Sequence, residues 1–292
     1  MLVLSLIVLS VPQVRADNAS STASVTNVVP VSSAVAITGE TITLTENTTT
    51  SVVVTATVTD NNGCEDIDSV SVKFFRTDLT STGDDDANHR YTQAATLDTG
   101  TCTAGGGDLS ANYTATIAVQ YYADPTDAGS ANATTTWSAK VTPADGSGGT
   151  AGTDDTTEMA TLTALDVTAA IEYGALALGA DTGEGDDTTT VTNTGNKSIS
   201  VQVDGYGTTD GQGKSMNCTV GSVSIEKEKY ATSTATAYAS KTALTDTAAT
   251  VTEFSVAQRT DGATTGSIYW GFGMPANGVS GDCSGTVVFT AL

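Results

Sequence analysis

Oxygen-bearing side chains on alternate residues mark one place in the chain that has the spacing of a cation site. The run Asp84-x-Asp86-x-Asn88 supplies three such ligands, and oxygens at this spacing can converge on an ion of the size of Ca²⁺. The run departs from the EF-hand template, because His89 stands where glycine belongs and Ala95 where the bidentate glutamate belongs. A calcium loop of another geometry and a plain solvated turn are therefore the two interpretations.

A second group of oxygen ligands surrounds the turn that ends a predicted strand at residue 59. This group contains acidic and amide side chains within a few residues of one another. We expect both groups to lie at one end of the same domain and to close a Ca²⁺ site there, although no cofactor is required for folding. The candidate metal ligands are Asp60, Asn62, Asp66, Asp84, Asp86 and Asn88.

Hydrolytic chemistry has few candidate residues in this sequence. His89 is the only histidine, and it lies in a hydrophilic loop rather than in an apolar setting that would form a cleft. A pair of carboxylates, as in glycosidases, is compatible with any acidic sequence, but clefts that cleave sugars usually carry many aromatic residues, which are only 5% of this chain. The sequence therefore predicts that the protein is not an enzyme.

Four cysteines divide evenly between the two halves of the chain. Three pairings are possible, and the one that keeps each disulfide within its own half joins Cys64 to Cys102 and Cys218 to Cys283. The chain has no CxxC motif and a single histidine, so a structural zinc site is not expected. Paired cysteines are typical of an oxidising compartment.

Residues 1–16 have the pattern of a secretion signal. An apolar run of about nine residues is followed by Val14-Arg15-Ala16, a suitable cleavage site before Asp17, although no basic residue precedes the run. The run is too short to span a bilayer as a helix. We expect an extracellular or cell-surface protein without a membrane span, and the N-x-S/T sequons then provide glycosylation candidates at Asn18, Asn47, Asn112, Asn132 and Asn196.

The acidic composition limits the partners of the chain. Thirty-three acidic residues oppose 11 basic ones, and the formal net charge is −22. Such a surface is repelled by nucleic acid and by anionic lipid headgroups, so neither is an expected partner. Solubility at a crowded surface, binding of divalent cations and a saline habitat are the three interpretations of this charge.

Composition and periodicity predict an all-β fold. Thr, Ala, Ser, Val and Gly dominate, and short runs of alternating apolar residues recur between turn signals, as in Ig-like sandwiches. The stretch at 143–158 loses this alternation and separates the cysteine pairs two and two. We therefore expect two tandem Ig-like or jelly-roll-like β-sandwich domains, with a signal at 1–16, a first domain at 17–142, a linker at 143–158 and a second domain at 159–292.

Part of the sequence resembles known surface proteins. Residues 173–205 contain a Gly-x-Leu-x-x-Gly segment and then Val-x-Asn-x-Gly, expected to form a tight hairpin at Asn193-Thr-Gly-Asn196. The segment resembles β-sandwich surface proteins of archaea and ultrasmall bacteria, and distantly the TasA and camelysin group of extracellular fibre subunits. The runs ITLTENTTTSVVVTATVTDNNGCEDI and YYADPTDAGS of the first half resemble an Ig-like module of such surface proteins. This chain differs from the fibre subunits in having an additional first domain.

The resulting hypothesis is a structural subunit of an extracellular assembly, either a filament or a surface coat, that forms a homopolymer. Residues 20–37 are a candidate donor strand for a neighbour's sheet, and a simple first strand of their own domain is the alternative. A calcium-stabilised adhesin or ligand-binding module that recognises glycans or other surface proteins is the second hypothesis, and a hydrolase is the third.

Overall fold

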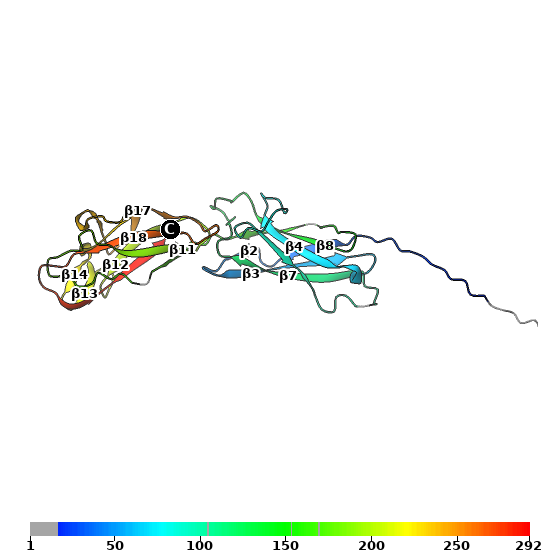
Figure 1. Cartoon of the computed structure of the whole chain (residues 1–292), viewed down its shortest axis with the longest axis horizontal. Coiled ribbons are helices and arrows are strands. Elements are labelled where there is room, and N and C mark those ends of the chain that lie inside the picture. Colours follow the sequence, from blue (N-terminus) through cyan, green and yellow to red (C-terminus); the bar gives the residue numbers. More distant parts are fainter. Residues whose placement is uncertain (1–16, 104, 153, 169) are drawn as a thin grey trace, which may run out of the picture.

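The computed structural model describes residues 17–292, except residues 104, 153 and 169, and it confirms the all-β prediction. Two β-sandwiches follow one another along the long axis of the molecule, and the residues before the first strand extend away from it (Figure 1). Helical structure in these residues is limited to three 3-10 turns, at Cys64–Asp66 (η1), Ile225–Lys227 (η2) and Tyr238–Ser240 (η3). None of the described helices is long and apolar enough to cross a membrane.

Two sheets form the first sandwich. The first sheet has the order β1 (Val31–Ile37), β3 (Thr49–Thr59), β7 (Ser110–Gln120) and β6 (Thr96–Leu97). The second has the order β2 (Thr41–Ile42), β9 (Asp155–Met159), β8 (Trp137–Ala144), β4 (Ser69–Arg76) and β5 (Arg90–Ala94). Their inner faces bury one continuous apolar core.

Strict alternation explains why β3 and β7 are the longest pair in this sandwich. Every second side chain of β3 from Val52 to Val58 is buried, and all eleven residues of β3 pair with β7 in antiparallel register. In the second sheet, Trp137 of β8 is fully buried and stacks on Phe74 of the neighbouring strand β4, with ring centroids 4.8 Å apart. Burial of aromatic area on this scale supplies much of the driving force for closing the two sheets.

Three sheets form the second sandwich. The largest has the order β10 (Leu165–Val167), β11 (Asp187–Asn193), β18 (Thr265–Phe272), β15 (Glu228–Ala231) and β16 (Thr242–Ala243). Opposite it lies β17 (Ala249–Val256), β12 (Ile199–Tyr206) and β20 (Thr286–Ala291), and a small sheet of β14 (Ser222–Ser224), β13 (Lys214–Val220) and β19 (Ser280–Ser284) extends the structure. Trp270 is fully buried in the core of this sandwich, against Tyr230 and Phe289.

The predicted linker at 143–158 has strand residues at both of its ends. Its first two residues complete β8, and Asp155–Met159 forms β9, which pairs with β8 and β2. The strand escapes recognition in the sequence because its outward face is polar and only Thr157 and Met159 face the core. The apolar contacts pass from the first core to the second between Leu162 and Leu165.

The expected hairpin at Asn193-Thr-Gly-Asn196 is also corrected. The strands on either side of it, β11 and β12, do not pair with each other but belong to opposite sheets, so the turn is an arch across the sandwich. Asn193 holds the arch, since its Nδ2 donates to the carbonyls of Lys197, Val256 and Ala257. Its Oδ1 accepts from the backbone N–H of Gly195 at 2.9 Å.

The same arch joins the two sandwiches. The side chain of Asn196 is fully buried, and its Nδ2 donates to the carbonyls of Ala123 and Ala160, each at 3.0 Å. Its Oδ1 accepts from the backbone N–H of Leu162 at 2.6 Å. Both donors and the oxygen of one buried amide thereby bond across the boundary between the domains.

Two further side chains of the second sandwich reach the first. Gln258 donates through Nε2 to the Tyr122 carbonyl and to Asp124 Oδ1, both at 2.9 Å. The guanidinium of Arg259 lies 4.6 Å from the ring centroid of Tyr122, a cation–π contact. In return Asn88 donates to the carbonyl of Arg259 at 2.9 Å. We call these contacts, together with those of Asn196, the interdomain joint.

Replacing Asn196 with alanine tests the joint. The variant loses three hydrogen bonds and leaves two carbonyls and one N–H unsatisfied in a buried place, which costs about 2–4 kcal/mol of stability. Chemical denaturation measures the loss, and small-angle scattering should show a broader distribution of interdomain angles. Asn112→Ala is the matched control, because Asn112 is exposed and accepts one hydrogen bond, from Thr57. Equal stability of the two variants would contradict the assigned role of Asn196.

Candidate functional site

The structure contains both disulfides at the pairings that the sequence analysis predicts, Cys64 with Cys102 and Cys218 with Cys283. The first fastens the loop after β3 to the loop that precedes β7. The second joins the neighbouring strands β13 and β19. Each disulfide lies within its own sandwich, so neither one crosses the interdomain joint.

The two predicted groups of cation ligands lie at opposite ends of the first sandwich, so the expectation of a common end is wrong. Asp60 follows the end of β3 that pairs with the start of β7, and its N–H donates to the Leu109 carbonyl. Asn88 lies beside the other end of β7, where its Nδ2 donates to the Tyr122 carbonyl. The full length of the β3–β7 ladder separates the groups, so they cannot share one ion.

The loop that contains Asp84, Asp86 and Asn88 is stabilised from within. Asp86 caps a tight turn, because its Oδ1 accepts from the Asn88 N–H at 2.9 Å and its carbonyl accepts from the Arg90 N–H. Asn88 is buried and donates to both sides of the interdomain joint. The side chain of His89 contacts Asp86, with 3.5 Å between Nδ1 and Oδ1. The loop has a structural explanation, and a cation there stays a prediction.

At the other end the structure brings together residues that the sequence separates. A carboxylate oxygen of Asp60, one of Asp66 and one of Asp145 all lie within 4.8 Å of one another. Asp145 is absent from the predicted ligands, because it lies 85 residues beyond Asp60 in an ordinary Ala-Asp-Gly turn. Among the residues that the structure describes, this is the one group of three acidic, histidine or cysteine ligands.

Four of the five glycosylation candidates remain accessible to a modifying enzyme. Asn18, Asn47 and Asn112 are exposed, and Asn132 is partly exposed. Asn196 is a correction, because it has no exposed surface and its Nδ2, the atom that would carry the glycan, donates two hydrogen bonds within the interdomain joint.

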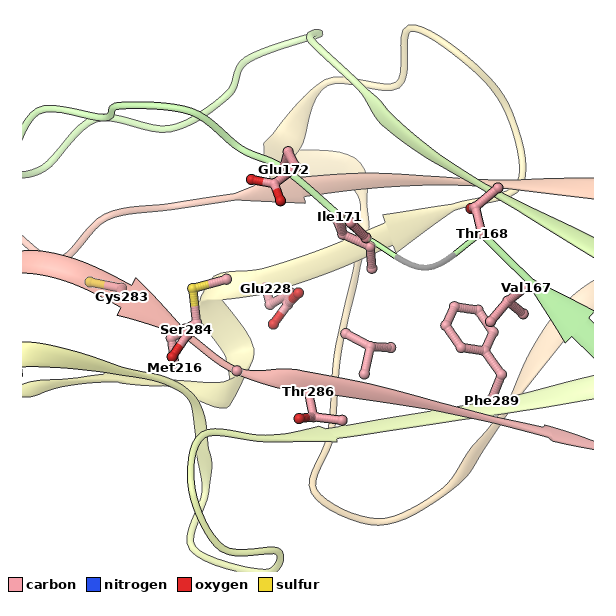
Figure 2. A pocket seen from close by; sticks show the side chains of 13 residues that line it. Val167, Thr168, Ile171, Glu172, Met216, Glu228, Cys283, Ser284, Thr286 and Phe289 are labelled. Atoms are coloured by element: carbon pink, nitrogen blue, oxygen red, sulfur yellow. The ribbon is translucent and has the colours of Figure 1, made fainter.

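A groove opens along the second sandwich between the largest sheet and β20. One wall carries Val167, the last residue of β10, and Ile171, and the other wall carries Phe289 of β20 (Figure 2). Val287 of β20 also lines the opening. The opening has a volume of about 430 Å³. Its lining is only partly buried although it packs against the apolar core, so core side chains are reachable from outside here. We call this opening the β20 groove.

The backbone of β20 adds a second feature to this groove. In the described structure β20 pairs with β12 along one side and is the last strand of its sheet. An edge strand with free N–H and C=O groups is a template for pairing with another strand. The β20 groove therefore offers apolar pockets beside an unpaired strand edge, the combination that binds extended peptides.

A buried carboxylic acid lies in the floor of the groove. Glu228 is 3% exposed, and burial raises its pKa to about 7. Tyr173 donates from its hydroxyl to Glu228 Oε1 at 2.8 Å, and burial likewise raises the pKa of Tyr173. Figure 2 shows Glu228 between the segment of Ile171 and the strand of Thr286. Periodicity does not reveal this acid, because its neighbours in sequence are charged as well.

Residues 17–30, which we call the leading segment, precede the first strand and are almost all exposed to solvent. They form no regular structure, and Val25 is 86% exposed. The donor predicted at 20–37 divides here: β1, from Val31, pairs with β3 of its own sandwich, as the alternative interpretation held, while the residues before it project outward (Figure 1). From residue 18 to residue 39 the sequence has no charged side chain.

Comparisons with known proteins yield no family. No protein-family model and no curated protein matches the sequence. The CsuC–CsuE chaperone–tip adhesion subunit pre-assembly complex from archaic chaperone-usher Csu pili of Acinetobacter baumannii is similar over 88% of this chain and 99% of that chain, at 10% identity and a TM-score of 0.37. The secreted serine protease VesC from Vibrio cholerae is similar over 86% of this chain and 49% of that chain, at 10% identity and a TM-score of 0.19. Neither likeness bears on the function of this chain, and the resemblance to archaeal surface proteins and to TasA gains no support.

The buried acid makes stability depend on pH in a defined direction. The folded state keeps the Glu228 proton up to a pKa of about 7, whereas the unfolded chain releases it near 4.5. The free energy of unfolding should therefore fall as pH rises through this window, by roughly 3 kcal/mol in all. Glu228→Gln should remove that loss, so the variant should melt above wild type at pH 8 and equal to it at pH 4.

Glu226→Gln is the control for this effect. Glu226 is exposed, and the hydrogen bond from Ser224 lowers its pKa. Its replacement should give no gain at high pH. Melting curves of both variants between pH 4 and pH 8 provide the measurement, and a Glu228→Gln difference that does not grow with pH would contradict the assignment.

Proposed function

We propose that this protein is a secreted, non-enzymatic subunit of an extracellular homopolymer, in which residues 17–25 of the leading segment of one copy occupy the β20 groove of the next. The observation that carries the proposal is the unpaired edge of β20 beside an open apolar groove. Two intradomain disulfides support an oxidising, extracellular location.

The chemistry of the leading segment supports it as the occupant. Like-charged copies with a formal charge of −22 repel each other, but a stretch without charged side chains approaches a neighbour without that cost. The alternate residues Ala19, Ser21, Ala23 and Val25 are small, as a narrow groove between partly buried side chains requires. Backbone hydrogen bonds to β20 would supply affinity, and the alternate side chains would supply register.

The position of the segment supports transfer to a second copy. The leading segment leaves the far end of the first sandwich and extends away from the second sandwich, which carries the groove (Figure 1). Donor and acceptor are thus different surfaces, and contacts of this head-to-tail kind generate open filaments when they do not close into a ring. A surface coat built from the same contact is the second form of this assembly.

Complementary variants test the proposal. Deleting residues 17–25 removes the donor but leaves every described strand intact, and Val287→Arg places a charge in the acceptor groove. Each variant alone should be monomeric, whereas an equimolar mixture should form dimers and nothing larger, because only one productive contact is left per pair. Light scattering after gel filtration measures the masses.

Val220→Arg is the matched control, because Val220 is 57% exposed and lies outside the β20 groove. It should polymerise like wild type. A cooperative melting transition of Val287→Arg close to that of wild type shows that the variant is folded. Wild type that stays monomeric at high concentration, or a mixture that stays monomeric, would overturn the filament and leave the adhesin as the better hypothesis, tested by saturable binding of the monomer to surface glycans.

A further inference from the structure

The outer end of the first sandwich gathers negative charge without a basic partner. Asp60 ends β3 in one sheet, Asp145 follows β8 in the other sheet, and Asp66 lies on the turn η1 that connects the layers. A carboxylate oxygen from each lies within 4.8 Å of the others. None of the three takes part in an ion pair among the described residues, so three negative charges face one another.

Burial makes this arrangement costly for the protein alone. Asp60 is 1% exposed and Asp145 is 7% exposed. One oxygen of Asp60, Oδ1, accepts from the Asn62 N–H at 2.8 Å, but Oδ2 is buried and has no hydrogen-bond partner. A buried carboxylate without a partner or counter-ion is strongly disfavoured, and coordination of a metal ion is one of the few ways to satisfy it.

We propose that Asp60, Asp66 and Asp145 bind one Ca²⁺ ion at this end of the sandwich. The donors are carboxylate oxygens, which hard cations prefer, and no thiolate or imidazole belongs to the group. Ligand oxygens that each lie 2.3–2.6 Å from Ca²⁺ are at most about 5.2 Å apart, a limit that the separation of 4.8 Å satisfies.

The site is coupled to the base of the leading segment. Asn27 donates from Nδ2 to Asp145 Oδ2 at 2.9 Å, and Asn62 Oδ1 accepts from the Val28 N–H at 2.6 Å. A cation that orders Asp145 and the turn around Asn62 therefore also orders residues 26–28. Where the proposed polymer forms, Ca²⁺ should direct the free residues 17–25 away from their own sandwich, and this last step rests on the proposed function.

Calorimetry and thermal melting on the full chain test the site directly. After treatment with a chelator, wild type should bind one Ca²⁺ and melt at a higher temperature in calcium. Asp145→Asn should weaken binding about tenfold or more, because the number of charged ligands sets the dissociation constant. In chelator the same variant should melt at or above wild type, because a repulsive charge is gone, and in calcium it should melt below wild type.

Asp84→Asn is the matched control and also tests the other acidic loop. It should bind Ca²⁺ like wild type. Deletion of residues 17–25 should likewise leave calcium binding intact, so failure of the polymer and failure of the site are separate results. Equal melting of wild type in chelator and in calcium, an equal effect of Mg²⁺ at the same concentration, or loss of binding in Asp84→Asn instead of Asp145→Asn would overturn the site.

Discussion

Buried amide groups at the interdomain joint set the geometry on which the rest of the molecule depends. Asn196 and Gln258 of the second sandwich donate to carbonyls of the first, and Asn88 donates in the opposite direction. These groups are satisfied only while the sandwiches lie end to end, since a separated joint would leave them unpaired. The joint thereby keeps the β20 groove and the leading segment far apart, so in the proposed assembly the strand that fills the groove belongs to another molecule.

The negative charge of the chain is distributed in a way that favours contact between the leading segment and the β20 groove. A net charge of −22 keeps separate molecules apart, while the leading segment has no charged residue and Glu228 in the groove keeps its proton up to about neutral pH. Acidic side chains are instead concentrated at turns, and the most buried group of them, around Asp60, lies where the leading segment joins the first sandwich. The surfaces proposed to meet are thus the least repulsive ones, which specific association of acidic copies requires.

Local pattern was sufficient to predict the fold class, the strand cores and the disulfide pairings. The alternation from Val52 to Val58 indicates a buried strand face, because strand side chains alternate with a period of two. Pairing between strands is not local, so the sequence did not reveal that β9 belongs to the first sandwich or that the arch at Asn196 crosses between sheets. Asp145 and the β20 groove depend on the same long-range pairing, and nothing near them in the sequence distinguishes them from ordinary turns and strands.

The direction of the strands has a mechanical consequence. In both sandwiches long strands such as β3, β7, β11 and β18 run roughly along the long axis of the molecule (Figure 1). A pull between the leading segment and the second sandwich is then parallel to the strands, and the residue pairs of β1 with β3, the ladder that the leading segment runs into, are loaded together in shear instead of being unzipped one by one. The molecule should therefore resist tension along its axis far better than force applied across it.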